Sequence, residues 1–273
     1  MAVFHADALV IRSREYGESD RLITLFSREK GKLQAIAKGV RKPKSRQRAG
    51  SQLFSYSEFL LHHGRNLNTI NQASSKESFP HLWNDLDRTL AATAIAELLD
   101  IATIVEQSNL ELFTLTLASF FLLEHTEPTL VQSAYTLRLL NILGYRPKMG
   151  QCPLCGSLIK GDRIYFSPEA GGTVCGQCRS SERGRWLSAG SIAFIRQLTD
   201  VDLSKLDRLR WNSRMQTEII EGLQLYCEGT FDRSLRSWSM GSKLIGEGAG
   251  LQTVQRKAGH DDERSVVDGA GEN

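Results

Sequence analysis

The sequence has no apolar run long enough to cross a lipid bilayer. Its longest mainly apolar stretch, residues 112–123, has twelve residues, whereas a membrane-spanning helix needs about 20. His5, Asp7 and Arg12 interrupt the N-terminal segment, which therefore lacks the apolar centre of a signal peptide. These absences predict a cytoplasmic protein without a membrane partner.

The sequence also lacks the short motifs of common catalytic sites. It contains no Gly-x-Ser-x-Gly turn, no His-Glu-x-x-His pair and no compact cluster of carboxylates. The glycine-rich residues 246–250 resemble a nucleotide-binding loop, but they follow no predicted strand and open no predicted helix. We therefore expect that the protein is not an enzyme. A nuclease or ligase-like factor with an unusual site is the alternative that product analysis on labelled DNA would expose.

Positive charge is modest overall but concentrated near the N-terminus. The formal net charge is only +3, yet residues 1–50 hold twelve lysines and arginines against five acidic residues. A positively charged end of this kind suits a polyanion such as nucleic acid.

The first eighty residues have the pattern of a small barrel. Turn signals separate five short segments that are rich in Val, Ile, Leu and Thr. The segments are residues 8–14, 21–27, 32–38, 53–62 and 67–72. The OB-fold is a five-stranded barrel that binds nucleic acid, so we expect an OB-fold DNA-binding domain over residues 1–79.

Beyond residue 80 the apolar pattern takes the period of a helix. Helices are predicted over residues 82–105, 110–125, 128–144, 189–198 and 214–228. We expect a helical domain over residues 80–245, which makes the protein α+β. From residue 246 the chain is rich in glycine and charge, and this composition predicts a disordered tail over residues 246–273.

Four of the five cysteines form two close pairs. Cys152 and Cys155 make one Cys-x-x-Cys pair, and Cys175 and Cys178 make the other. Two such pairs at this separation are typical of tetrahedral zinc, and four sulfur ligands leave no position for a catalytic water. We predict one structural Zn²⁺ in a module at about residues 150–181. The alternative is a pair of redox-active dithiols.

A run of cations lies between the third and fourth predicted strands. Residues 38–48 contain six lysines and arginines and no acidic residue. Each phosphate contacted by a cation releases counterions, so such a loop binds DNA in a salt-sensitive way. A merely solvated loop is the alternative that charge alone leaves open.

Short stretches before and after the cysteine pairs also form a recognisable series. They are Ala8-Leu-Val-Ile-Arg12, Tyr16-Gly-Glu-Ser-Asp20, Leu25-Phe26, Gly31-Lys32, Ala37-Lys38-Gly39-Val-Arg41, Leu137-Arg-Leu-Leu-Asn-Ile-Leu-Gly-Tyr145-Arg-Pro147 and Leu235-Arg-Ser237. In these stretches and in the order of its features, the sequence resembles the RecO family over about residues 3–245.

The resemblance implies a mediator of DNA repair and homologous recombination. Such a protein has an OB-fold, a helical domain and in many members a zinc finger. It binds single- and double-stranded DNA and anneals complementary strands. The implied partners are RecR, RecF in gap repair, and the C-terminal tail of single-stranded DNA-binding protein, and together they load RecA at gaps. The implied location is the cytoplasm, in association with the nucleoid.

The resemblance also implies functional residues. The four cysteines correspond to the metal ligands. The implied DNA contacts are Lys38, Arg41, Lys42, Lys44, Arg46 and Arg48 in the loop, with Arg12, Arg14, Arg21 and Lys32 extending the surface. The helical domain is expected to contact the tail of single-stranded DNA-binding protein, where Arg138 is the available cation because residues 132–135 carry none. The alternative function is a zinc-ribbon adaptor that scaffolds other proteins, with the basic loop incidental.

Overall fold

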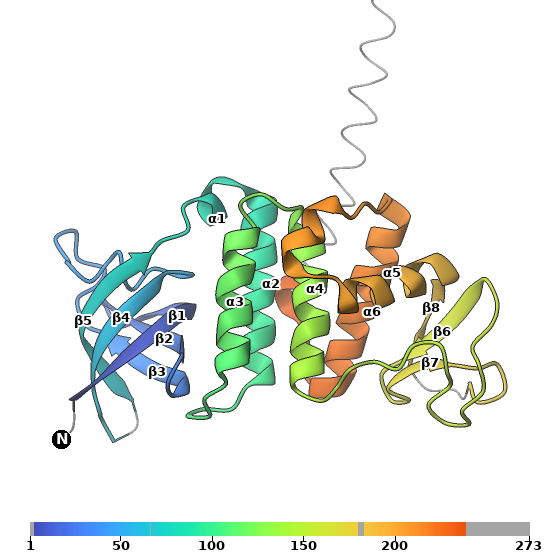
Figure 1. The fold of residues 1–273 in the computed structure, drawn as a ribbon. Helices are drawn as coiled ribbons and strands as arrows, with labels where there is room; N and C mark the ends of the chain where they lie inside the picture. Colours follow the sequence, from blue (N-terminus) through green and yellow to red (C-terminus); the bar gives the residue numbers. More distant parts are fainter. Residues whose placement is uncertain (1–2, 66, 180–182, 239–273) are drawn as a thin grey trace, which may run out of the picture.

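A computed structural model describes residues 3–65, 67–179 and 183–238 (Figure 1). A β-barrel lies at one end, a layer of helices occupies the middle, and a small sheet lies at the other end. The tail predicted over residues 246–273 lies outside the described residues. Within the described ranges, no helix combines the length and the apolar character needed to cross a membrane.

The N-terminal strands close into the predicted barrel. Their spatial order is β1-β2-β3-β5-β4, and all neighbours are antiparallel except β3 and β5. The strands are β1 (Val3–Tyr16), β2 (Asp20–Ser27), β3 (Gly31–Ala37), β4 (Tyr56–His62) and β5 (Asn68–Glu77). This closed five-stranded barrel confirms the architecture expected of an OB-fold.

Strand β1 is longer than its sequence pattern suggested because it serves two neighbours. Its first half pairs with β4 and its second half pairs with β2. A bulge between Val10 and Arg12 bends the strand where the partner changes. At this bend the Val10 amide donates to the Ser55 carbonyl at 2.9 Å, and the Phe54 amide donates to the Val10 carbonyl at 2.8 Å.

Strand β2 is buried on both faces. One face, with Ile23 and Leu25, fills the barrel interior. The other face, with Phe26, packs into the core that the helices share. The alternation of apolar and polar residues is therefore lost over the last six residues of β2, and the barrel and the helices are joined by one apolar interface.

The predicted first helix is in fact two helices, α1 (His81–Asn84) and α2 (Leu86–Ala102). The prediction of one helix over residues 82–105 was wrong because Asp85 adopts an extended backbone and its carboxylate caps α2 by accepting from the Arg88 amide at 3.0 Å. The remaining helices, near their predicted positions, are α3 (Leu110–Leu122), α4 (Pro128–Ile142), α5 (Ala189–Asp200) and α6 (Ser213–Phe231), and a 3₁₀ helix, η1 (Leu203–Arg208), was not predicted.

The segment after α6 folds back onto α2. The Glu97 carboxylate of α2 accepts hydrogen bonds from the amides of Arg236 at 3.1 Å and Ser237 at 2.9 Å. Leu235 and Trp238 are buried beside it. The short motif at residues 235–237 is thus explained by a contact between two elements that are distant in the sequence.

Candidate nucleic-acid interface and metal centre

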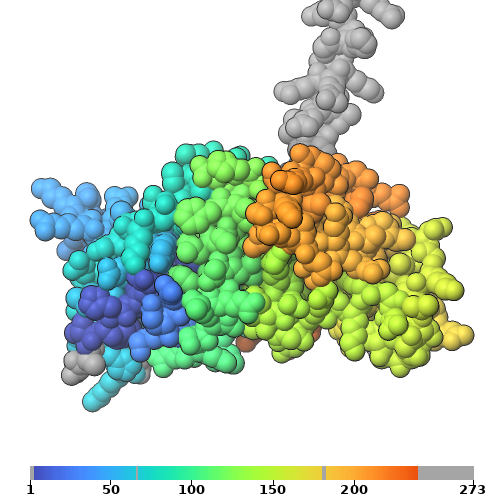
Figure 2. Space-filling model, viewed as in Figure 1, coloured from blue at the N-terminus to red at the C-terminus, as the bar shows by residue number. Residues whose placement is uncertain are grey.

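The predicted basic loop is an ordered series of turns between β3 and β4. Successive amides donate to carbonyls three residues earlier, from Lys42 to Gly39 at 3.1 Å, from Ser45 to Lys42 at 3.0 Å, and from Arg48 to Ser45 at 3.4 Å. Figure 2 shows this segment, in blue, standing out from the barrel. The turns hold the exposed cations at fixed positions along the loop.

The start of the loop is attached to β2 through Asp20. The Asp20 carboxylate accepts hydrogen bonds from the Gly39 amide at 2.7 Å and the Ser19 hydroxyl at 3.1 Å. The Gly39 hydrogen bond is the main cause that lowers the pKa of Asp20, and the charges of Lys38 and Lys42 lower it further. Gly39 has φ +62°, a conformation that glycine adopts without strain.

Arg41 fixes the loop to the turn between β1 and β2. Its guanidinium pairs with Glu15 at 3.1 Å and donates to the Glu18 carbonyl at 3.2 Å. Its amide donates to the Ser19 carbonyl at 3.0 Å. Arg41 is therefore partly engaged within the protein, although its side chain still borders the groove described below.

The other predicted loop cations are exposed. None of them forms an ion pair with any residue that the structure describes. They are Lys38, Lys42, Lys44, Arg46 and Arg48, and Arg14 on β1 is also exposed and unpaired among the described residues.

Lys32 and Arg12 lie apart from this group. The Lys32 side chain is only 12% exposed, and its ammonium lies 3.2 Å from the Asp100 carboxylate of α2 and donates to the Asp100 carbonyl at 2.5 Å. Arg12 approaches the same carboxylate at 3.4 Å. These two cations connect the barrel to the helices through the same residue of α2.

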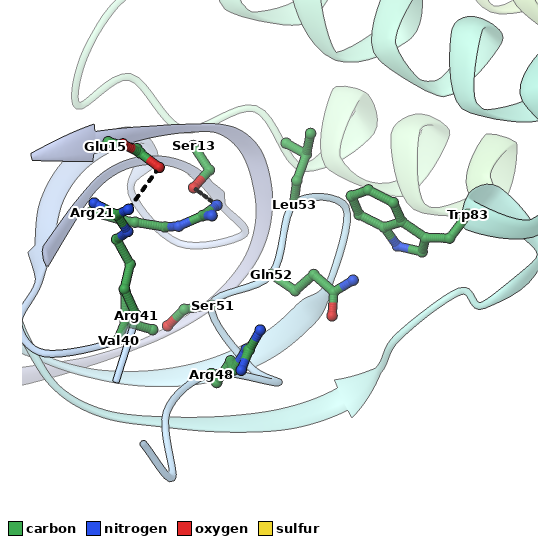
Figure 3. Close-up of a pocket in the computed structure, with 10 residues that line it drawn as sticks. All are labelled: Ser13, Glu15, Arg21, Val40, Arg41, Arg48, Ser51, Gln52, Leu53 and Trp83. Carbon is green, nitrogen blue, oxygen red and sulfur yellow. Dashed lines mark hydrogen bonds and ion pairs between the residues drawn. The ribbon is translucent and has the colours of Figure 1, made fainter. Parts of the chain in front are cut away.

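A groove beside the basic loop brings several of these elements together (Figure 3). Its volume is about 500 Å³. Cations come from β2 and the loop, polar groups from β1, and apolar side chains from the loop and α1. The lining residues are Ser13, Glu15, Arg21, Val40, Arg41, Arg48, Ser51, Gln52, Leu53 and Trp83.

The sequence had not identified Trp83 as a functional residue. It lies within the apolar pattern that predicted a single long helix, and only the break at Asp85 turns the short helix α1 toward the barrel. Among the aromatic residues of the barrel, Tyr16 is exposed, whereas Phe26 and Phe59 are buried in the core. Exposure in the folded protein is thus the property that separates Trp83 from a core aromatic.

The sequence suggested Arg138 of α4 as a contact for a protein tail, and the structure places it against another part of the chain. Gln132 and Ser133, both on α4, are buried. The Arg138 guanidinium donates to the Val201 carbonyl. Arg138 therefore holds α4 against the segment after α5 and is not a free surface cation.

The four paired cysteines converge as the spacing predicted. Their sulfur atoms all lie within 4.8 Å of one another, and the Sγ atoms of Cys155 and Cys175 are 3.6 Å apart. Zinc–sulfur bonds of about 2.3 Å in a tetrahedron place sulfurs about 3.8 Å apart. The cluster therefore fits a four-coordinate metal ion, and the donor set of four thiolates fits zinc.

Each cysteine pair is shaped by a tight turn. The Gly156 amide donates to the Cys152 carbonyl at 2.9 Å with Gly156 at φ +77°, and the Arg179 amide donates to the Cys175 carbonyl at 3.1 Å. Cys152 is buried and Cys155 is exposed. With four protein ligands available, the site can support structure but has no open position for substrate.

A three-stranded sheet of β6 (Arg163–Ser167), β7 (Gly172–Val174) and β8 (Arg185–Ser188) links this centre to the helices. Phe166 stacks on Tyr226 of α6 with ring centroids 5.1 Å apart. The neighbouring arginines are engaged within the protein, since Arg183 pairs with Glu228 at 3.4 Å and Arg185 pairs with Glu221. Arg179 lies over the Trp186 ring at 5.2 Å from its centroid.

Comparisons of both parts of the chain with known proteins point to the same family. The family described as "Recombination protein O N terminal" matches residues 1–79, and "Recombination protein O C terminal" matches residues 84–239. DNA repair protein RecO of Desulfitobacterium hafniense strain Y51 is 59% identical over 278 residues, covering 100% of both chains. DNA repair protein RecO of Heliobacterium modesticaldum is 41% identical over 246 residues, covering 88% of this chain and 89% of that protein. The chain therefore belongs to the RecO family of DNA repair and recombination proteins, which are recombination mediators and not enzymes.

Proposed function

We propose that this protein binds single- and double-stranded DNA through its barrel and anneals complementary single strands. The observation that carries the proposal is the ordered loop of residues 38–48. It holds Lys38, Lys42, Lys44, Arg46 and Arg48 exposed and without ion pairs among the described residues. Fixed, unpaired cations bind phosphates without reading base sequence, and they do so in exchange for released counterions.

Annealing follows from the same electrostatics. Two complementary strands repel each other through their phosphates, and a cationic surface that covers these phosphates lowers the repulsion. No nucleotide hydrolysis is needed for this step, because base pairing itself supplies the free energy. The barrel's role in the proposal is to hold a strand by its backbone while its bases can still pair.

The partners in this proposal come from membership of the RecO family. With RecR, and with RecF in gap repair, the protein would help load RecA onto gaps that are covered by single-stranded DNA-binding protein. The tail of that protein would bind a surface of the helical region other than Arg138, because the Arg138 guanidinium is occupied by the Val201 carbonyl. We assign residues 1–79 to DNA binding and residues 80–245 to partner contacts and the metal module.

One Zn²⁺ bound by Cys152, Cys155, Cys175 and Cys178 has a structural role in this proposal. The ion would tie together the two cysteine turns. Hydrogen bonds from residues 148–150 to residues 171–173 already hold the first turn near the small sheet. No step of DNA binding or annealing requires it.

The direct test is fluorescence anisotropy of a labelled single-stranded oligonucleotide over a range of salt concentrations. The variant Lys44→Ala/Arg46→Ala removes two unpaired loop cations. The matched control Lys205→Ala/Arg208→Ala removes two exposed cations of η1. If both loop cations contact phosphates, the slope of log K against log salt becomes shallower by about 1.4, because each single-strand contact contributes about 0.7.

The control variant should keep the slope of the wild type, since η1 lies in the helical region and not on the barrel. An unchanged slope in the loop variant would place DNA elsewhere on the molecule. A wild type that binds no DNA even at low salt would overturn the proposal and favour the adaptor alternative.

A further inference from the structure

Trp83 leaves part of its apolar ring exposed at the groove, where a ligand could cover it. It is 42% exposed and lies on the wall of the groove beside the basic loop (Figure 3). Leu53 lies next to it on the same wall. A large aromatic ring left partly in water beside a concave, charged surface is a common mark of a binding site.

The indole ring of Trp83 packs against the ring of Phe54, which holds it in position. The ring of Phe54 lies 5.5 Å from that of Trp83, measured between centroids, and Phe54 itself is buried. Phe54 has φ +69°, a conformation that a bulky residue rarely adopts, and its amide is fixed by the Val10 carbonyl at 2.8 Å. Phe54, the residue that supports Trp83, therefore has a strained backbone conformation.

Helix α1 is held by a second contact. The His81 Nε2 atom lies 2.9 Å from the Phe120 carbonyl oxygen of α3. Because α1 has only four residues, this contact and the packing on Phe54 together fix where its side chains lie. Trp83 is therefore oriented before any ligand arrives, which reduces the entropy lost on binding.

Cations border the same groove. Arg21 donates to the Ser13 hydroxyl at 3.1 Å, which holds its guanidinium on the groove wall. Arg48 forms no ion pair with the described residues. The acidic Glu15 also borders the groove, but Arg41 pairs with it at 3.1 Å. Arg21 and Arg48 therefore remain available to a negatively charged ligand.

We infer that this groove binds one unpaired nucleotide, with its base stacked on Trp83 and its phosphates at Arg21 and Arg48. The volume of about 500 Å³ lies within the range of about 300–1,000 Å³ that is typical of small-ligand sites. A base within a duplex presents only its edges, so it cannot stack on a protein ring. The groove thus gives the protein a preference for single strands. This inference rests on the proposed DNA-binding function and assigns a specificity residue within it.

The first test compares Trp83→Ala with the wild type on a single-stranded oligonucleotide and on a duplex of the same length. Loss of one base stack should weaken single-strand binding about 5- to 150-fold. Duplex binding should change less than about 2-fold, because no base is available to stack. Trp83→Phe should keep much of the single-strand affinity, since phenylalanine retains an aromatic face. Trp186→Ala, which removes a comparably exposed tryptophan from the metal module, is the matched control.

A second test uses an abasic strand, and its first comparison needs only the wild type, so misfolding of a variant cannot affect it. Wild-type protein should bind an abasic single strand more weakly than a normal strand of the same length. Trp83→Ala should bind both strands with equal, low affinity. Since stacking involves no counterion, the salt slope should be the same for Trp83→Ala as for the wild type.

The outcomes separate this inference from the proposed function. If Trp83→Ala binds the normal strand as the wild type does, or if the abasic strand binds as well as the normal strand, the inference is overturned. The loop variant Lys44→Ala/Arg46→Ala would still lose affinity and slope in that case. If that variant also behaves as the wild type, the proposed location of DNA on the barrel fails as well.

Discussion

Lys32 of β3 and Asp100 of α2 form the most enclosed ionic link between the barrel and the helices. The ammonium lies 3.2 Å from the carboxylate, and the Lys32 side chain is only 12% exposed. Such a pair is costly to break, because the remaining partner is left desolvated without its counter-charge.

The Asp100→Asn variant should therefore lose about 1–3 kcal/mol of unfolding free energy. The control Asp200→Asn removes the carboxylate that pairs with Arg146 at the surface, where the Asp200 side chain is 71% and the Arg146 side chain 54% exposed. This variant should lose less than about 1 kcal/mol of unfolding free energy. Urea unfolding followed by circular dichroism would measure both. Equal losses in the two variants would contradict the role given to Lys32 as a link between barrel and helices.

Gly31 and Gly17 offer a matched pair of turn glycines. Both have positive φ, +67° and +62°, so alanine strains the backbone at either position. A Cβ atom at Gly31 would lie 1.9 Å from the Gln107 carbonyl oxygen, whereas one at Gly17 meets nothing within 4 Å.

Gly17→Ala should cost about 1 kcal/mol of stability, and Gly31→Ala at least about 3 kcal/mol, because the backbone after α2 must also move. Thermal melting of both variants would compare them. Similar melting temperatures would mean that the close approach of β3 to residue 107 is not maintained.

Glu218 of α6 makes the free energy of unfolding depend on pH in the acidic range. Burial alone would raise the pKa of its carboxyl group, but hydrogen bonds from the Ser188 amide, the Ser188 hydroxyl and the Ser191 hydroxyl lower the pKa from 4.5 to about 2. The Ser188 amide and the Ser191 hydroxyl each donate at 2.8 Å. The stabilisation is fully present above about pH 4.5 and is lost as the pH falls toward 2.

The Glu218→Gln variant should be less stable than the wild type by about 1–3 kcal/mol at neutral pH. The difference between the two proteins should shrink between pH 4.5 and 2. Denaturant unfolding at several pH values would follow this difference. A constant difference across that range would show that the carboxylate charge is not what stabilises the junction of β8, α5 and α6.

Removal of the metal should affect the cysteine module and spare the barrel. The wild type should carry one zinc per chain, and Cys152→Ser should carry none. Cys227→Ala is the control, because Cys227 is buried in α6 away from the cluster and should leave the zinc content unchanged.

A strong chelator should lower the melting temperature of the wild type but not that of Cys152→Ser, while the salt slope of DNA binding stays the same. Melting of the wild type that is indifferent to chelation would exclude a structural role for the metal.

The sequence predicted those features that depend on local pattern. Cys152, Cys155, Cys175 and Cys178 converge as their spacing indicated, because each pair is brought together by a single turn. Strands β2 and β3 lie within one residue of their predicted bounds, whereas β4 begins three residues later and β5 ends five residues later than predicted. The full length of β1 escaped prediction because it depends on pairing with two different strands.

Features that depend on tertiary contacts could not be predicted from the sequence. Lys32 belongs to the same cationic region as Arg48, but only the fold shows that one faces Asp100 and the other faces the groove. The short strand β7 lies in a glycine-rich stretch without a strand pattern. The role of Trp83 likewise depends on a helix break at Asp85 and on the support from Phe54.

The parallel contact between β3 and β5 closes the barrel and is its shortest seam between two strands. Among the described residues, strands β3 and β5 pair in parallel through only Ala35–Asn68 and Ile36–Thr69, whereas each of the other neighbours pairs through at least seven residues. Local opening, and with it amide hydrogen exchange, should therefore begin at this seam. The basic loop starts directly after β3. A strand of DNA bound along that loop would hold the end of β3 in place, and it would therefore slow amide hydrogen exchange in β3 and β5.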